Sequence, residues 1–299
     1  MTVALVTGAS RGIGRAIALR FASAGIAVAG TARTIDPGDG PLEGSLAETV
    51  EAIRANGGRA VAIGADLGDP DTDRADIVRS AAGAFGEPVQ VLVNNAAAPR
   101  RFELGFTGMN RDEFLTQVEV NVWAGWELAL AALEGMRELG AGWILNISSM
   151  GAAPKVGPPY ESIPQVGAQC LYGSTKAMID RLTTGAAMEL WDDGISVNAL
   201  APAGAVATAN ARTVAGAHLA HAEPEETMAE AALALCTGNP KVLTGRVTTS
   251  LAILRELDRP VRSLDGAALV EGWQPADIDP RRCPPSYLSA FTQSRSQTP

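Results

Sequence analysis

Short apolar runs alternate with stretches of helical periodicity along most of the chain. The apolar runs lie at Val3–Val6, Ile26–Gly30, Ala60–Ile63, Val89–Val93, Trp143–Ile147, Ile195–Leu200 and Val242–Thr249. Between them, apolar positions recur with the spacing of amphipathic helices. This alternation is typical of βαβ units and a parallel sheet. We therefore expect a doubly wound, Rossmann-type α/β fold with seven parallel strands, nearly all of them buried, and helices on both faces.

Start signals mark two of the helices between these strands. Ser45 and Glu48 form a capping box, and Asn110 with Glu113 caps a long helix that continues to about Leu139. Further helices are expected at Ile13–Ala24, Thr72–Phe85, Pro224–Leu235 and in a segment that ends near Trp191. After residue 250 the pattern weakens, with one or two helical turns expected at Leu251–Leu257. We expect residues 1–249 to form one domain and residues 250–299 a partly irregular C-terminal extension.

The composition favours a soluble globular protein. Of the 299 residues, 46% are hydrophobic and 19% are charged, which is enough apolar material for a sizeable core. The net charge of −9 argues against nucleic acid or an anionic membrane as a partner, because phosphate binding requires a basic surface. The apolar runs are too short for a secretory signal or a transmembrane helix, so we expect a cytoplasmic protein.

The cysteines and histidines carry little functional signal. Cys170, Cys236 and Cys283 are widely spaced without a CxxC pair, which is typical of reduced thiols in a cytosolic protein. His218 and His221 have no cysteine or carboxylate set at the spacing of metal ligands. We therefore expect no metal site.

The segment Tyr172-Gly173-Ser174-Thr175-Lys176 carries the strongest chemical signal. In a helix, residues i and i+4 share a face, so the phenol of Tyr172 and the ammonium of Lys176 are expected to be neighbours. A fixed positive charge stabilises the phenolate, which suits a general acid or base at neutral pH. The spacing alone is equally that of an exposed surface pair. Lysine occurs only at Lys155, Lys176 and Lys241, which argues against a chance pairing.

A glycine-rich loop follows the first expected strand and reads Thr7-Gly8-Ala9-Ser10-Arg11-Gly12-Ile13-Gly14. Glycines permit a tight turn and let the backbone approach a pyrophosphate at the N-terminus of the next helix. A plain βα turn can carry the same glycines. The strand–loop–helix context is nevertheless the one that dinucleotide binding requires.

With these motifs the chain resembles the single-domain short-chain dehydrogenase/reductase family over roughly residues 1–249. Thr7–Gly14 is similar to the family's TGxxxGxG loop, and Tyr172 with Lys176 is similar to its YxxxK pair. Asn94–Ala97, at the end of the fourth strand, resembles its NNAG segment. These motifs occur in the family's order along the chain.

The resemblance implies hydride transfer between a nicotinamide and a carbonyl or alcohol carbon. Tyr172 would exchange a proton with the substrate oxygen, while Lys176 would stabilise its phenolate and hydrogen-bond the nicotinamide ribose. Ser149 matches the family's serine after the fifth strand and would donate to the substrate oxygen. Ser148 points the opposite way along the strand and is the alternative serine. Asn121 matches an asparagine that interrupts its helix and holds a water linking Lys176 to solvent.

The glycine loop and the resemblance also indicate the cofactor contacts. These are Gly8, Ser10, Arg11, Gly12, Ile13, Gly14, Arg33, Asp66, Leu67, Asn95, Ala96, Ala97, Tyr172, Lys176, Pro202, Gly204 and Val206. Asp66 is equally suited to capping a turn. We expect NADP(H) rather than NAD(H), because Ala32 stands where an acid would accept the ribose 2′-hydroxyl, and Arg33 and Arg11 can meet a 2′-phosphate. Asp36 is the competing acid, but it opens a Pro-Gly turn.

The chain departs from the family pattern in three places. Ser149 and Tyr172 are further apart than usual, and the surplus residues fall in the proline-rich stretch 157–165. Tyr160 lies nearer the usual position but has Pro164, not lysine, four residues on. The loop after the sixth strand, Pro202–Thr208, has an extra residue, and the terminal VDGG is replaced by the C-terminal extension.

The expected function is an NADP(H)-dependent oxidoreductase that acts on a small ketone, aldehyde or alcohol. In the family the substrate pocket comes from variable segments, here Pro99–Thr107, the stretch from Ser149 to Tyr172, and Thr208–Ala222. Its expected lining residues are apolar or basic, namely Phe102, Phe106, Met150, Val156, Tyr160, Arg100 and Arg101.

Two alternative functions stay open. An enoyl reductase would space its tyrosine and lysine further apart, and a cofactor-binding sensor or scaffold without turnover commonly loses one of the two. The resemblance also implies a homodimer or homotetramer formed through the two long helices, Asn110–Leu139 and Cys170–Trp191.

Overall fold

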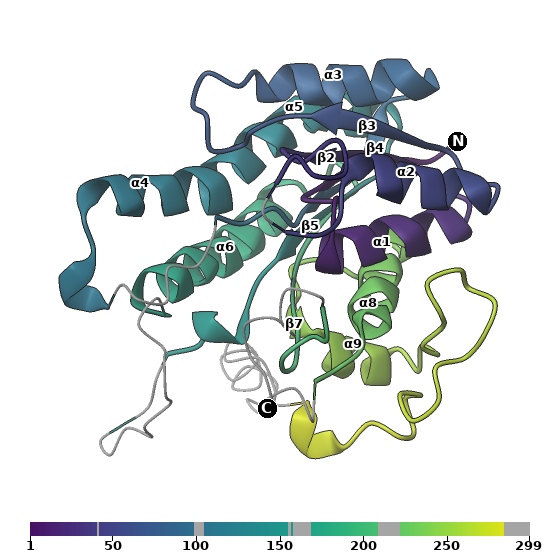
Figure 1. Cartoon of the computed structure of the whole chain (residues 1–299). Helices are drawn as coiled ribbons and strands as arrows, with labels where there is room; N and C mark the ends of the chain where they lie inside the picture. Colours follow the sequence, from purple (N-terminus) through teal and green to yellow (C-terminus); the bar gives the residue numbers. More distant parts are fainter. Residues whose placement is uncertain (41, 99–104, 155–156, 158–168, 209–221, 284–299) are drawn as a thin grey trace.

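The apolar pentapeptide Val3–Thr7 forms β1, the central strand of a parallel sheet, and each of its residues is buried. The computed structural model describes residues 1–40, 42–98, 105–154, 157, 169–208 and 222–283. The other described strands are β2 (Ala27–Ala32), β3 (Ala60–Gly64), β4 (Val89–Asn94), β5 (Gly142–Ile147), β6 (Ile195–Ala201) and β7 (Val247–Thr249). The seven strands follow the order β3-β2-β1-β4-β5-β6-β7 and all pair in parallel (Figure 1). The expected doubly wound fold is confirmed.

Helices cover both faces of this sheet (Figure 1). One face carries α1 (Gly12–Ser23), α2 (Leu46–Ala55), α8 (Glu225–Thr237) and α9 (Ser250–Glu256). The other carries α3 (Arg74–Phe85), α5 (Ala124–Glu138) and α6 (Gln169–Glu189), while α4 (Arg111–Val118) packs against α6. Short 3₁₀ turns lie at Phe106–Gly108, Met150–Ala152 and Pro280–Arg282.

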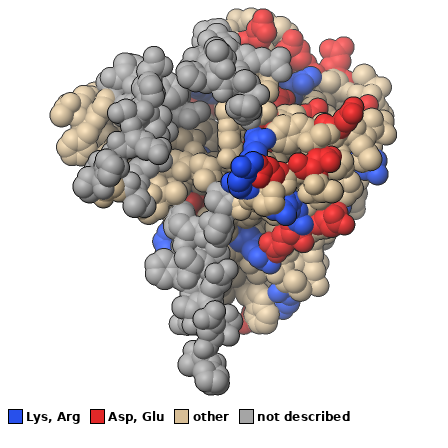
Figure 2. All heavy atoms as spheres, turned by 90° about the horizontal axis from the view of Figure 1, so that it is seen from below, with Lys and Arg blue, Asp and Glu red and all other residues tan. Residues whose placement is uncertain are grey.

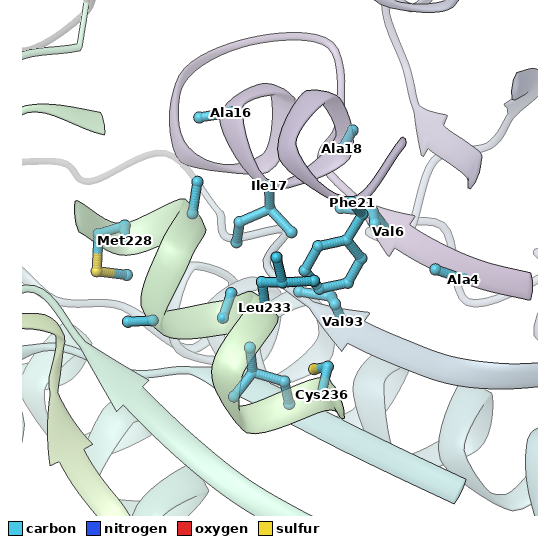
Figure 3. Close-up of a cluster of buried hydrophobic side chains, with 14 of the residues drawn as sticks. Ala4, Val6, Ala16, Ile17, Ala18, Phe21, Val93, Met228, Leu233 and Cys236 are labelled. Carbon is cyan, nitrogen blue, oxygen red and sulfur yellow. The ribbon is translucent and has the colours of Figure 1, made fainter. Parts of the chain in front are cut away.

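The larger core cluster lies between the sheet and the α1–α8 pair. Figure 3 shows Ile17 and Phe21 of α1 pointing toward Leu233 of α8, and all three side chains are almost fully buried. The C-terminal segment contributes to this cluster through Val261 and Ile278, which are also buried. Helix α8 is therefore enclosed along most of its length.

The predicted start signals are present. Ser45 Oγ accepts from the Glu48 backbone N–H at 3.2 Å, as predicted for a capping box, but the Glu48 carboxylate accepts from the Ser45 hydroxyl at 2.9 Å in place of the Ser45 backbone N–H. Asn110 caps α4 by accepting from Glu113 N at 2.9 Å. The long helix that begins there is interrupted by a π-helical segment, Glu119–Trp123, before α5.

The last strand is shorter than predicted. We expected Val242–Thr249, but only Val247–Thr249 pairs with β6. Before it the chain turns at Asn239, whose carbonyl accepts from Leu243 N at 2.8 Å, and Gly245 has a φ of +71°. Leu243 is buried from this turn, so its apolar character comes from core packing and not from a strand.

The chain order reverses between β1 and β4, and the carboxyl ends of the strands meet along one edge there. The glycine loop leaves β1 at this edge, Asn95 follows β4, Ser148 follows β5, and Pro202 follows β6. In open α/β sheets, ligands bind outside this edge at the point of reversal.

Candidate active site

The glycine loop after β1 is too tightly folded to carry a side chain at its three glycines. Gly8 and Gly12 have φ values of +68° and +54°, a region that favours glycine. A Cβ atom at Gly14 would overlap the Gly8 carbonyl oxygen and the Asn95 side chain. The loop therefore meets the N-terminus of α1 as bare backbone, an arrangement that fits a pyrophosphate.

Asn95 and Ala96 fasten this loop to the end of β4. Asn95 Nδ2 donates to the Thr7 carbonyl at 2.8 Å, and the backbone N–H groups of Asn95 and Ala96 both donate to Thr7 Oγ1 at 2.9 Å. The Asn95 side chain, a predicted cofactor contact, thus holds the glycine loop in shape. Ala97, the next predicted contact, is exposed.

The two arginines expected near a 2′-phosphate differ in how firmly they are held. Arg11 Nη2 donates to Thr34 Oγ1 at 3.0 Å and to the Gly44 carbonyl at 2.8 Å. Its Nε is buried and has no acceptor in the described part of the chain. The Arg33 side chain is 63% exposed, with Nη1 3.9 Å from Asp66 Oδ2. One guanidinium is fixed and the other is accessible.

The two acids near these arginines both belong to turns. Asp66 Oδ1 accepts from Gly68 N at 2.9 Å, so the turn-capping role that the sequence left open for Asp66 is present. Leu67 beside it is buried. Asp36 lies in an exposed turn closed by the Asp39 carboxylate, which accepts from Asp36 N at 2.9 Å.

Tyr172 and Lys176 lie on one face of α6, with Lys176 Nζ 5.6 Å from the centre of the Tyr172 ring. Lys176 is only 3% exposed, and its Nζ donates to the Ile147 carbonyl at the end of β5 at 2.7 Å. Tyr172 is half-buried. The pair is therefore not the exposed surface pair that the spacing alone would allow, and a buried charge acts strongly on its neighbours.

Ser149 follows β5 and begins a 3₁₀ turn that packs against α6. Its Oγ accepts from Gly151 N at 3.1 Å. A Cβ atom on Gly173 would overlap the Gly151 carbonyl, so this turn touches α6 next to Tyr172. The alternative serine, Ser148, is buried, and its Oγ has no partner among the described residues.

Asn121 lies in the π-helical interruption and is held on three sides. Its Oδ1 accepts from Ala98 N at 2.8 Å, and its Nδ2 donates to Gln117 Oε1 and to Thr175 Oγ1, both at 3.0 Å. Thr175 directly precedes Lys176, so Asn121 contacts α6 beside the Tyr172–Lys176 pair. The interruption implied by the family resemblance is present at this residue.

The segment after β6 lies across from the glycine loop, because a Cβ atom on Gly12 would contact the Thr208 side chain. Gly204 N donates to Glu223 Oε1 at 3.3 Å. The backbone N–H of Val206 has no acceptor in the described part of the chain. The Gly204 N–H is therefore engaged within the protein, whereas the N–H groups of Ala205 and Val206 have no acceptor among the described residues.

Two residues that support the site, Thr175 and Arg74, are specified by no motif of the sequence. The buried Arg74 guanidinium donates to the Leu67 carbonyl at 3.1 Å and to Glu119 at 2.6 Å. It thereby ties the loop after β3 to the π-helical segment that carries Asn121. An arginine in the first turn of a helix is ordinarily solvated, so nothing in the local pattern indicated this role.

Much of the expected substrate pocket lies outside the described residues. This applies to Arg100, Arg101, Phe102, Val156, Tyr160 and most of Thr208–Ala222, together with His218 and His221. Of the expected lining residues that are described, Phe106 and Met150 are exposed.

Among the residues described, no group of three or more His, Cys, Asp or Glu side chains is arranged to hold a metal ion. No helix in the same ranges is long and apolar enough to cross a membrane. On the face shown in Figure 2, basic and acidic side chains are interspersed.

The chain is similar to a known protein family and to several of its members. The family model of the short chain dehydrogenases matches residues 2–218. The short-chain reductase protein NovJ of Streptomyces niveus is 38% identical over 207 residues, covering 69% of this chain and 70% of NovJ. The 3-oxoacyl-[acyl-carrier-protein] reductase FabG of Staphylococcus aureus is 38% identical over 199 residues, covering 67% of this chain and 72% of FabG.

The fold is also similar to the solved structure of a reductase. The NADP-bound 3-oxoacyl (acyl-carrier-protein) reductase of Agrobacterium tumefaciens C58 superposes with a TM-score of 0.69 at 27% identity. The match covers 83% of this chain and 92% of the reductase.

Proposed function

The chain belongs to the short-chain dehydrogenase/reductase family, and from this premise we propose that it interconverts a ketone or aldehyde and an alcohol with NADP(H). The observation that carries the proposal is the buried Lys176 ammonium beside the half-buried Tyr172 phenol, at the edge of the sheet where the glycine loop begins. A nicotinamide dinucleotide, which the family binds, supplies or accepts the hydride when it is present.

In this proposal Tyr172 exchanges a proton with the substrate oxygen. The Lys176 ammonium, which the Ile147 carbonyl holds beside Tyr172, offsets the negative charge that develops on the Tyr172 oxygen when the proton is transferred. Ser149 Oγ accepts from Gly151 N, which leaves its own hydroxyl proton to donate to the substrate oxygen. A donor fixed in this way stabilises negative charge that develops on that oxygen.

Asn121 supports proton exchange between the Tyr172–Lys176 pair and solvent. Its side-chain amide is fully engaged by Ala98, Gln117 and Thr175, so its contribution is to fix the π-helical interruption next to Lys176. An interrupted helix has backbone carbonyls free of their usual partners, and a water bound there would link Lys176 to solvent.

NADP(H) is favoured by the charges after β1 and β2. Arg11 and Arg33 offer two guanidinium groups, whereas Ala32 ends β2 without a carboxylate to accept a ribose 2′-hydroxyl. The NADP held by the similar reductase of Agrobacterium tumefaciens agrees with this preference. We also propose a cytoplasmic location, because three free cysteines suit a reducing compartment.

Consumption of NADPH against a panel of ketones and aldehydes tests the proposal. Tyr172→Phe is expected to reduce turnover by roughly 10²–10⁴-fold while NADPH binding stays within about twofold of wild type. Tyr160→Phe is the matched control, since Tyr160 is the competing tyrosine, and it should retain turnover.

Each other outcome points elsewhere. Near-normal turnover by Tyr172→Phe would remove the mechanism. Activity on C=C bonds alone would favour an enoyl reductase. Tight NADPH binding without turnover across the panel would favour a sensor.

A further inference from the structure

Glu223 is a fully buried carboxylate between the segment after β6 and the start of α8. Its backbone pairs with that segment as an isolated parallel bridge to Val206. The Glu223 N–H donates to the Ala205 carbonyl at 2.8 Å, and the Glu223 carbonyl accepts from Ala207 N at 2.9 Å. The segment 203–208 is thus held at its middle by one residue from a distant part of the chain.

The Glu223 side chain ties the same segment to two helices. Oε1 accepts from Gly204 N at 3.3 Å, and Oε2 accepts from Thr227 Oγ1 at 2.5 Å and from Ser250 Oγ at 2.6 Å. Ser250 Oγ in turn accepts from Ala203 N at 3.3 Å. One carboxylate therefore connects the segment after β6, the first turn of α8 and the start of α9.

Both helices are rigid supports for this carboxylate. Helix α8 is packed against α1 through Leu233, Ile17 and Phe21 (Figure 3), and α9 is buried through Leu251 and Leu254. Burial raises the pKa of the Glu223 carboxyl, and the hydrogen bonds from Ser250, Thr227 and Gly204 act in the opposite direction. Burying a carboxyl group costs free energy of folding unless its oxygens are hydrogen-bonded, and the contacts to Glu223 supply those hydrogen bonds.

The contacts to Glu223 also decide which backbone groups the segment offers to a ligand. Gly204 N, Ala207 N and the Ala205 carbonyl are all engaged by Glu223. The N–H groups of Ala205 and Val206 are left without an acceptor in the described ranges. The segment starts at the carboxyl end of β6, beside the end of β5 that precedes Ser149, and its far end, Thr208, lies opposite Gly12 of the glycine loop.

We propose that Glu223 is a positioning residue for the nicotinamide half of the cofactor. It acts by clamping residues 203–208 so that this segment meets the nicotinamide end in one fixed conformation. The inference rests on the proposed function only in requiring that the chain binds a nicotinamide dinucleotide. The adenosine half would meet Arg11 and Arg33, which follow β1 and β2 on the other side of the site, so we expect its binding to be independent of this clamp.

The test measures dissociation constants of the full-length protein for NADPH and for adenosine 2′,5′-bisphosphate, which lacks the nicotinamide half. If the wild type binds NADH more tightly, NADH and AMP are the pair. Glu223→Ala should weaken NADPH binding by about tenfold or more and leave binding of the fragment within about twofold. Glu223→Gln should recover most of the loss, because its amide oxygen still accepts and the two hydroxyl groups can reorient.

Two further variants keep the test decisive. Ser250→Ala removes one contact to Glu223 and should give a smaller loss of the same kind, even if Glu223→Ala folds poorly. Glu230→Gln is the matched control, since Glu230 lies on the same helix, is equally buried and pairs with Arg20 at 2.6 Å and Arg259 at 2.7 Å. It should lower the melting temperature without changing the ratio of the two dissociation constants.

Each remaining outcome counts against the proposal. Equal losses for NADPH and the fragment, or no loss for either, would overturn the role of Glu223 and leave the proposed function standing. A wild-type protein that binds neither dinucleotide would overturn the proposed function itself.

Discussion

Asn121 Nδ2 donates to Thr175 Oγ1 at 3.0 Å, and this bond joins the π-helical interruption to the helix that carries Tyr172 and Lys176. The Thr175 hydroxyl in turn donates to the Tyr172 carbonyl at 2.8 Å. The backbone of the predicted proton donor is therefore linked through a single hydroxyl group to the asparagine of the predicted relay.

Removing that hydroxyl should disturb both ends of the link. Thr175→Val keeps the side-chain shape but leaves one Asn121 N–H without its acceptor, which costs about 1–3 kcal/mol in a buried site. We expect a lower melting temperature and a loss of roughly tenfold in kcat, measured by thermal unfolding and steady-state kinetics. Thr175→Ser keeps the hydroxyl and should remain close to wild type. A lower melting temperature with unchanged kcat would make the link purely structural.

Arg33 should decide the preference between the two cofactors. Its side chain is 63% exposed and only loosely paired with Asp66, so it is free to meet a 2′-phosphate. A hydrogen bond to a charged group contributes about 1.5–3 kcal/mol, so Arg33→Ala should raise KM for NADPH by roughly 10- to 100-fold. KM for NADH should change far less.

Arg79 offers a control for that prediction. It is equally exposed and also paired with acids, Asp73 and Asp76, but lies on α3. Arg79→Ala should leave both KM values unchanged. Equal effects of Arg33→Ala on NADPH and NADH would contradict a role in reading the 2′-phosphate.

Gly14 should tolerate no side chain. A Cβ atom there would overlap the Gly8 carbonyl, and overpacking of this kind typically costs about 1–3 kcal/mol. Gly14→Ala should therefore lose cofactor binding and stability together, as measured by NADPH titration and urea unfolding. Gly83→Ala is the matched control, because Gly83 is exposed on α3 and its Cβ would meet nothing within 4 Å. It should stabilise the protein by about 0.5–1 kcal/mol.

The fold was predictable from sequence because most of its strands, with β3 at the edge of the sheet as the clearest exception, are buried on both faces. Such strands appear as short continuous apolar runs, and Val3–Thr7 and Ile195–Ala201 are buried throughout. Equating an apolar run with a strand was wrong at Leu243. This residue is buried although it lies in a turn, and it made the predicted last strand too long. Val261 and Ile278 also join the core from irregular backbone, where no periodicity marks a buried position.

The residues of the candidate site also fall into those that a local pattern predicts and those that it does not. Tyr172 and Lys176 were found because their spacing along one helix is local. The contacts of Arg74 and Glu223 join segments far apart in the chain, and only the folded structure brings such partners together. Local pattern also could not show that Asn95 holds the glycine loop, because its partner Thr7 lies on another strand.

The face formed by α5 and α6 should be where two copies of the chain associate. A groove between these helices is lined mainly by apolar side chains, among them Leu133, Ile179 and Leu182. Leu130, which also lines the groove, is 55% exposed, and exposed apolar faces of this kind mark interaction sites. In a twofold dimer the same patch of each copy meets the other, so one apolar face is enough for association, and we expect a homo-oligomer.

Leu130→Glu should shift the mass measured by light scattering toward the monomer, because it places a charge on this face. Leu269→Glu is the matched control, since Leu269 is 57% exposed in the C-terminal segment, and it should leave the mass unchanged. A wild-type protein that is already monomeric at micromolar concentration would contradict the prediction.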